Sequence, residues 1–502
     1  MEAARFGVID IGSYELVLKI FEFVSGKKVR VTDDVRYVLE LGRETYTRHS
    51  LCFETIEKLC EVLLGFRKIL EEYHVTECDV VATSGLREAD NARLILDRIY
   101  VRTGFRVTII SNSEQRLVTY KALAMYPEEL EEFSQGNTAI LEVGSGSIQI
   151  SLLDKKNIAS TQNIKIGSLR ISELLYRLGS NLVDVDGLLD EIINNDLQTF
   201  KRIFMKDKRI DNLIATGDQI TLFTRNPEKG GFERRMTAED FVARYRKLKG
   251  MSERELAKEL QMSGKRALFL LLCVRIYGRM IELVEAKQIW IPGTDICDGM
   301  AIDFALRKKK ISAKHDFRED IINEVRGIAK RYKEDVEHTA FVGEIAGNIF
   351  QLTRKLHGMG KKEKLLLESA ALIHGCGKYI SIQNAGESAY HIIMATEIIG
   401  LSHCEREMLA KVVKYNTLPT DGEEDLTVIK LTAILRVANA LDRSHKQKMK
   451  GYRLELRGDE MWIHTKTRED LTLELGLFDE KAALFQEVYG LKVLIRQKKF
   501  DV

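Results

Sequence analysis

The chain has 502 residues, of which 45% are hydrophobic and 30% are charged. This length predicts three or four domains, because single domains usually contain about 100 to 200 residues. The composition excludes a fibrous or wholly disordered chain. The longest apolar run, 267–274, is far shorter than the roughly 20 residues that cross a bilayer, so we expect no membrane segment. A formal net charge of +2 gives no sign of a specific nucleic-acid partner.

The cysteines and the N-terminus indicate the compartment. The seven cysteines are scattered and none stands in a Cys-x-x-Cys spacing, which is typical of reduced thiols rather than a disulfide framework. The first residues lack the charged stub, apolar run and cleavage site of a secretory signal. We therefore expect a cytoplasmic protein.

Strand-like runs alternate with helical periods over the first 307 residues, a pattern typical of α/β domains. The predicted strands fall within 6–23, 80–83, 106–110, 138–153, 213–216 and 288–292. A basic segment at 308–317 predicts a linker. Residues 318–450 then show helical periods, and 451–502 return to strand-like alternation around one helix. The sequence thus predicts an α/β region, an all-α domain and a small α/β domain.

One pattern occurs twice among the predicted strands. Residues 7–14 and 139–146 each contain a strand, an acidic residue and a turn with glycine and serine. The glycines let backbone N–H groups approach a ligand and the serines add hydroxyl donors, so each turn can cradle phosphate oxygens. The acid before each turn can hold a hydrated Mg²⁺. We expect Asp10 and Glu142 at the metal, and phosphate contacts from Gly12, Ser13, Tyr14, Gly144, Ser145, Gly146 and Ser147.

This duplication resembles the actin-like and sugar-kinase ATPase fold, which is ribonuclease H-like and clamps a phosphorylated ligand between two α/β lobes. The resemblance implies one actin-like lobe over 1–128 and a second over 129–307. The all-α domain at 318–450 and the small α/β domain at 451–502 follow them.

Further segments resemble one family within that fold. Residues 80–91, 109–117, 166–170, 387–392 and 435–445 are similar to motifs of the exopolyphosphatase and guanosine pentaphosphate phosphohydrolase (Ppx/GppA) family. The resemblance covers essentially the whole chain, including the C-terminal extension of the longer members. It implies a homodimeric hydrolase that uses Mg²⁺ or another divalent cation. Its substrates would be the terminal phosphoanhydride bonds of inorganic polyphosphate or guanosine pentaphosphate.

The same resemblance implies catalytic roles for three residues. Glu114 would orient the attacking water and accept its proton. Arg87 would contact phosphate oxygens and stabilise charge in the transition state. The third position is Gln149, where the family has a second glutamate, and an amide can form hydrogen bonds but cannot accept that proton.

Other positions of the predicted cleft also depart from the family pattern. Glu142 is one methylene longer than the family's aspartate, Tyr14 replaces an asparagine and narrows the loop entrance, and Ser145 replaces a glycine. Two interpretations stay open: a hydrolase with an altered site, and a polyphosphate or nucleotide sensor that binds without turnover. Kinase chemistry is a third, disfavoured because no adenosine-binding Gly-Gly signature stands near 214–218.

The helical domain resembles HD-domain phosphohydrolases, whose metal site needs a His, a His-Asp pair and a later Asp. His338 and His374 are present, but Gly375 and Asn439 stand where the family has the two carboxylates. We therefore predict a degenerate HD-like domain that serves as a scaffold without a metal.

Overall fold

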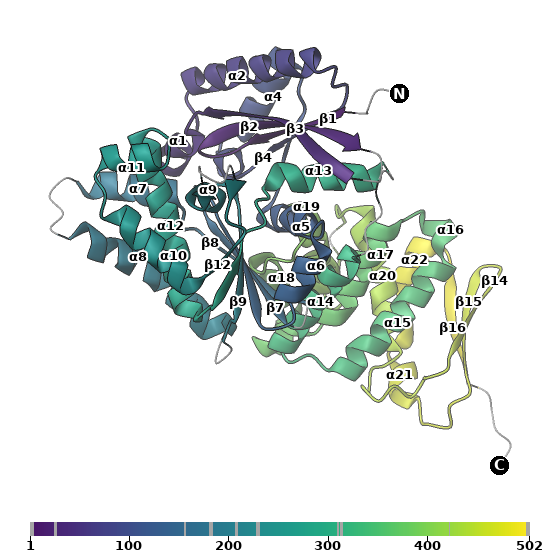
Figure 1. The fold of residues 1–502 in the computed structure, drawn as a ribbon. Coiled ribbons are helices and arrows are strands. Elements are labelled where there is room, and N and C mark those ends of the chain that lie inside the picture. Colours follow the sequence, from purple (N-terminus) through teal and green to yellow (C-terminus); the bar gives the residue numbers. More distant parts are fainter. Residues whose placement is uncertain are drawn as a thin grey trace. The chain divides into compact units, whose positions relative to one another are not determined.

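The computed structural model describes residues 5–24, 28–154, 157–179, 184–205, 209–226, 231–308, 311, 315–420 and 422–497 (Figure 1). The chain forms two compact units, residues 1–317 and 318–502. Among the described helices, none combines the length and the apolar character that a membrane span requires.

The first sheet of unit 1 has five strands in the order β3-β2-β1-β4-β5. The strands β1, β2 and β3 pair antiparallel, and β4 and β5 are added parallel to β1. The strands are β1 (Arg5–Ile11), β2 (Glu15–Val24), β3 (Lys28–Val38), β4 (Cys78–Ala82) and β5 (Val107–Ile109). Between and after them lie the helices α1 (Leu41–Arg48), α2 (Phe53–Glu72), α3 (Ser84–Arg87), α4 (Ala92–Thr103), α5 (Asn112–Leu123) and α6 (Pro127–Phe133).

The second sheet has six strands in the order β12-β13-β9-β6-β7-β8. They are β6 (Thr138–Val143), β7 (Ile148–Asp154), β8 (Asn157–Ile164), β9 (Asn212–Thr216), β12 (Arg235–Thr237) and β13 (Gln288–Trp290), and β10 (Arg225–Asn226) pairs separately with β11 (Gly231–Phe232). The helical segments are α7 (Ser168–Leu178), α8 (Val185–Phe200), η1 (Lys201–Met205), α9 (Asp218–Phe223), α10 (Ala238–Lys249), α11 (Glu253–Glu259), α12 (Gly264–Val284) and α13 (Ile296–Arg307).

The two sheets repeat one topology. The order β8-β7-β6-β9-β13 reproduces β3-β2-β1-β4-β5, with the same antiparallel and parallel pairings. The duplicated sequence pattern therefore belongs to a duplicated sheet. The predicted α/β class with two related lobes is confirmed, whereas the predicted boundary between the lobes stays a prediction.

Side-chain alternation along β1 decides where Asp10 points. Ile9 and Ile11 belong to the apolar cluster that includes α2, whereas Phe6 and Val8 pack with α13. Figure 1 shows α2 and α13 on opposite sides of this sheet. Since successive residues of a strand face opposite sides, Asp10 lies on the α13 side. The predicted second lobe includes α13, yet this helix packs against the first sheet.

The second sheet places Glu142 in the equivalent way. Ala139, Leu141 and Val143 join the apolar core that includes α12. Glu142 therefore points to the opposite face, where its carboxylate accepts hydrogen bonds from α5.

Unit 2 is helical and ends in a small sheet, as predicted. Its helical segments are α14 (Phe317–Arg331, which begins at the last residue of unit 1), α15 (Val336–Leu352), α16 (Arg354–His357), α17 (Lys361–Ile373), η2 (Cys376–Tyr379), α18 (Ala385–Ala395), α19 (His403–Tyr415) and α20 (Leu426–Ala440). The last part contains β14 (Arg453–Arg457), β15 (Glu460–Thr465), α21 (Thr472–Gly476), α22 (Phe478–Tyr489) and β16 (Lys492–Gln497), and the sheet order is β14-β15-β16.

Two other carboxylates, Asp442 and Glu334, lie near the HD-like positions, and the predicted loss of the metal site stays a prediction. Asn439 does not bond His338; the Oδ2 atom of Asp442, three residues later, lies 2.9 Å from its Nδ1 atom. A Cβ atom at Gly375 would lie 2.7 Å from Oε2 of Glu334, so another carboxylate occupies that neighbourhood. Burial raises the pKa of Glu334 to about 7. Within the described ranges, however, no three His, Cys, Asp or Glu side chains gather as metal ligands.

A buried hydrogen-bonded chain links the two histidines. The Nε2 atoms of His338 and His374 are 3.1 Å apart, and Nδ1 of His374 lies 2.8 Å from the carbonyl oxygen of Ala371. A carbonyl only accepts, so His374 donates through Nδ1 and accepts through Nε2. Burial, followed by the nearby His338, lowers the pKa of His374 to about 3. His374 is therefore an uncharged part of the core.

We predict that His374→Gln reduces the slope of the free energy of unfolding against pH in the acid range. The folded-state pKa of His374 lies below the unfolded value of 6.5. The stability that this residue contributes is therefore full above pH 6.5 and is lost as the pH falls toward 3, at a limiting slope of about 1.4 kcal/mol per pH unit. Urea unfolding of the full chain between pH 7 and pH 5 measures this slope. The matched control is His403→Gln at an exposed position. Equal slopes in His374→Gln and the wild type would contradict the assignment.

Candidate active site

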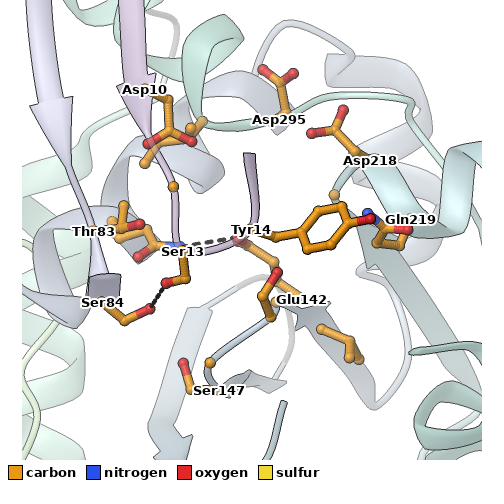
Figure 2. Close-up of a pocket in the computed structure, with 18 of the residues that line it drawn as sticks. Asp10, Ser13, Tyr14, Thr83, Ser84, Glu142, Ser147, Asp218, Gln219 and Asp295 are labelled. Carbon is orange, nitrogen blue, oxygen red and sulfur yellow. Dashed lines mark hydrogen bonds between the residues drawn. The ribbon is translucent and has the colours of Figure 1, made fainter. Parts of the chain in front are cut away.

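The two repeated turns lie on one cavity in unit 1. The β1–β2 turn and the β6–β7 turn line it together with the starts of α3 and α9 and the segment before α13 (Figure 2). Its volume is about 120 Å³, well below the roughly 300 to 1,000 Å³ of pockets that enclose drug-sized ligands. The polar and acidic lining residues are Asp10, Ser13, Tyr14, Glu15, Thr83, Ser84, Gln115, Glu142, Ser145, Ser147, Gln149, Asp218, Gln219 and Asp295. All seven residues predicted to bind phosphate line this cavity.

Three hydroxyl groups of the first lobe meet beside the second turn. Ser13 Oγ lies 2.7 Å from Ser84 Oγ, as drawn in Figure 2, and the Tyr46 hydroxyl lies 2.7 Å from the first and 2.9 Å from the second. A Cβ atom at Gly146 would stand 2.0 Å from that tyrosine oxygen. Only glycine lets the second turn come this close.

Arg170 fixes the second turn from the other side. Its Nε atom donates to the carbonyl oxygen of Gly146 at 2.6 Å, and Nη2 bonds Glu88 at 2.6 Å. Its guanidinium also lies over the Tyr46 ring, 3.8 Å from the centroid. The segment 166–170, noticed in the sequence only as a motif, therefore connects the second turn to the first lobe.

Tyr14 joins the lobes by packing. Its ring is 6% exposed and stacks on Phe269 of α12, with centroids 4.2 Å apart. The residue belongs to the first turn, but its side chain lies in the apolar core of the second lobe. The tyrosine thus anchors the first turn in the second lobe, and the narrowing of the loop entrance by Tyr14 stays a prediction.

Several carboxylates of the lining belong to positions that the sequence analysis missed. Besides the predicted Asp10 and Glu142, each one residue before the end of its strand, the lining contains three more acids: Asp218 begins α9, Asp295 caps α13 and Glu15 begins β2. Figure 2 shows Asp10, Asp218 and Asp295 arranged along one side of the pocket. The positions of Asp218 and Asp295 in the sequence could have identified them. Each stands within five residues of the end of a short strand, and a glycine lies between the strand and the acid.

Most of these acids have partners. Lys19 Nζ lies 2.5 Å from Asp295 and 3.1 Å from Asp298. Arg36 lies 2.9 Å from Asp218 and 3.2 Å from Glu15. The buried ammonium and guanidinium groups therefore neutralise three of the five cavity acids.

Asp10 and Glu142 have no such cation. Glu142 accepts hydrogen bonds from Gln115 at 3.0 Å and Thr119 at 2.9 Å. Oδ1 of Asp10 is buried and has no hydrogen-bond partner in the described part of the chain. Burial, then the charges of Asp295 and Asp218, raise the pKa of Asp10 well above its usual value. Burial is also the largest cause that raises the pKa of Glu142. These two carboxylates are the ones that a bound cation would stabilise most.

Gln149 lies directly opposite Glu142 in the β6–β7 ladder. Its side chain is 4% exposed, and Oε1 has no hydrogen-bond partner among the described residues. The repeat places Val17 opposite Asp10 in the first sheet. The second hairpin therefore presents a polar group to the cavity where the first presents an apolar one.

Glu114 and Arg87 do not line the cavity. The Glu114 carboxylate accepts a hydrogen bond from the Ser111 amide at 2.8 Å and closes a capping box at the start of α5. Arg87 donates to the carbonyl oxygen of Ile110 at 2.7 Å and to the side chain of Asn112. Gln115, the residue after Glu114, lines the cavity instead. The catalytic roles of Glu114 and Arg87 stay predictions.

Comparisons with known proteins agree with this architecture. A model described as the Ppx/GppA phosphatase family matches residues 20–308, and one described as Ppx/GppA phosphatase, domain III, matches residues 322–482. The chain is 19% identical over 496 residues to a guanosine-5'-triphosphate,3'-diphosphate pyrophosphatase of Vibrio parahaemolyticus, covering 94% of this chain and 95% of that protein.

Two solved structures share the fold of the first part of the chain. The Ppx/GppA family member of Aquifex aeolicus superposes with a TM-score of 0.50 at 21% identity, covering 62% of this chain and 99% of that one. An exopolyphosphatase of Cytophaga hutchinsonii superposes with a TM-score of 0.52 at 18% identity, covering 61% of this chain and 98% of that one. With family models that match most of its length, this chain belongs to the Ppx/GppA phosphatase family.

Proposed function

We propose that the cavity hydrolyses the terminal phosphoanhydride bond of inorganic polyphosphate or guanosine pentaphosphate with the help of a divalent cation. The observation that carries the proposal is the convergence of two acidic glycine-serine turns on one cavity, with Asp10 left uncompensated. A volume of about 120 Å³ suits the terminal phosphate end of a substrate, the part that carries the bond to be cleaved.

The turns supply donors for phosphate oxygens. Within the described residues, the backbone amides of Ser13, Ser145 and Gly146 donate no hydrogen bond. Amides in such turns form concave anion sites. The Ser13 and Ser84 hydroxyls, now bonded to each other, can turn to phosphate oxygens in the same place.

The cavity fits a Mg²⁺ ion or a similar divalent cation. Mg²⁺ is usually held by one or two carboxylates with waters and substrate phosphates, and the carboxylates of Asp10 and Glu142 both line the cavity. Asp10 would hold the ion, with Glu142 beside it. The cation would neutralise phosphate charge during water attack.

Glu114 keeps the proposed task of orienting the water and accepting its proton. Its carboxylate caps α5, which also carries Gln115 and Thr119, the two residues that hold Glu142. Glu114 therefore positions Glu142 in addition to its proposed direct role. Arg87 would add positive charge near the phosphates. The homodimer and the cytoplasmic location also stay predictions.

A polyphosphate or nucleotide sensor is the second candidate. Gln149 favours it, because the amide replaces the family's second glutamate and its Oε1 atom is buried without a partner in the described structure. Such a protein would bind substrate in the cavity and release little phosphate.

Replacing Asp10 should stabilise the protein. The pKa of Asp10 is raised in the folded state, so its contribution to stability is full below the unfolded pKa and is lost as the pH rises through the folded one. At pH 8 without divalent cations, we expect Asp10→Asn to raise Tm by roughly 2–4 °C, the shift for about 1 kcal/mol in a domain of 150–250 residues. The difference should vanish near pH 4.

The matched control for that measurement is Asp295→Asn. This change removes the nearer partner of buried Lys19, and breaking a buried ion pair is destabilising. Asp295→Asn should therefore lower Tm. If the Asp10→Asn protein melts at or below the wild-type temperature at pH 8, the buried Asp10 carboxylate has a stabilising partner and the assignment is wrong.

Phosphate release tests the hydrolase. With Mg²⁺ and either polyphosphate or guanosine pentaphosphate, Glu142→Gln and Glu114→Gln should each lose roughly 10²- to 10⁴-fold in rate. Neither change should lower Tm through the α5 capping box, because a glutamine at position 114 also completes such a box. Exposed Glu61→Gln on α2 is the control. Wild-type release no higher than that of Glu114→Gln would reject the enzyme, and release gained by Gln149→Glu would favour the sensor.

A further inference from the structure

Unit 2 contains a second polar cavity, which the proposed hydrolysis does not use. Its volume is about 240 Å³, and it lies at the end of α19, beside the C-terminal half of α20 and against α21 and α22. Its polar and charged lining includes Asn416, Thr417, Arg436, Asn439, Arg443 and Lys481.

Asn416 is the clearest sign of a ligand. Its side chain is 3% exposed, and neither Oδ1 nor Nδ2 has a hydrogen-bond partner among the described residues. A buried amide that lacks partners on both atoms is costly, and such groups are rare in native proteins. Because Asn416 lines the cavity, a ligand that both accepts and donates hydrogen bonds would satisfy it.

The cations of the cavity are incompletely compensated. Arg436 donates through Nε to the carbonyl oxygen of Tyr415 at 2.8 Å and through Nη2 to that of Leu418, while its Nη1 makes no hydrogen bond in the described structure. Burial lowers the pKa of Arg436. Exposed Arg443 forms no ion pair with any described residue. Among the described residues, the Lys481 ammonium bonds only its exposed neighbour Glu480, at 3.1 Å.

The one acid of the lining does not cancel this charge. Glu474 is 1% exposed and is already held by Lys448 at 3.2 Å and by the Ser444 hydroxyl at 2.5 Å. Lys448 lies outside the cavity lining and neutralises Glu474. Glu480 neutralises Lys481 in the same way, so Arg436 and Arg443 leave the cavity with a net positive charge.

We propose that this cavity binds a small phosphorylated metabolite, with its phosphate on Arg436, Arg443 and Lys481 and a hydroxyl or N–H group of its organic part on Asn416. Guanidinium groups suit phosphate oxygens. Nδ2 of Asn416 can donate to the ligand and Oδ1 can accept from it. A nucleoside monophosphate and a sugar phosphate both offer this chemistry. The site is independent of the hydrolysis in unit 1.

Calorimetric titration of the full chain without divalent cations tests the site. The probes are GMP, ribose 5-phosphate and inorganic phosphate, none of which contains a phosphoanhydride bond, so the result does not depend on the proposed hydrolase. We expect GMP or ribose 5-phosphate to bind at least tenfold more tightly than inorganic phosphate. Tight binding of GMP alone would identify the ligand as a nucleotide. Tight binding of ribose 5-phosphate would identify it as a sugar phosphate.

Two variants connect binding to the cavity. Asn416→Leu should keep or raise Tm, because it removes unsatisfied polar atoms, and should weaken binding at least tenfold. Arg443→Gln, at an exposed position, should weaken it similarly without unfolding the protein. Exposed Lys466→Gln is the control. Unchanged affinity in Asn416→Leu, no binding of either organic phosphate by the wild type, or equal affinity for inorganic phosphate would overturn the proposal.

Discussion

The buried carboxylate of Asp10 is the constraint on which the first unit depends. It lies among Asp218, Asp295, Glu15 and Glu142, and these charges add to the cost of its burial. The fold supplies Lys19 and Arg36 to three of those neighbours, whereas no lysine or arginine of the described residues pairs with Asp10 itself. A site that leaves one negative charge uncompensated beside free backbone donors is suited to a cation together with an anionic substrate.

Duplication explains why the acids meet. In each sheet the residue before the turn points away from the main helical layer, so Asp10 faces α13 and Glu142 faces α5. The copies have then diverged: Glu142 opposes Gln149, whereas Asp10 opposes Val17. Tyr14 and Arg170 connect the two halves by stacking on Phe269 and by bonding Glu88. The proposed metal ligands, Asp10 and Glu142, are therefore different residues from those that join the lobes, Tyr14 and Arg170.

The sequence predicted the elements whose signals are local. The repeat identified both turns, Asp10 and Glu142, and strand alternation identified the α/β lobes. The ion pairs could not be predicted, because Lys19 meets Asp295 and Arg36 meets Asp218 across long stretches of chain with no common spacing. Motif position also gave no sign that Asp442, three residues after Asn439, would bond His338. Likewise, nothing local shows that Glu114 caps α5 while Gln115 lines the cavity.

The most direct test is a calorimetric titration of the full chain with Mg²⁺, with and without the non-hydrolysable phosphate analogue imidodiphosphate. If Asp10 holds the cation between the two turns, the wild type binds one Mg²⁺ per chain, and binds it more tightly when imidodiphosphate is present. Asp10→Asn then weakens this binding at least tenfold. Equal Mg²⁺ affinity in the wild type and Asp10→Asn would contradict the account.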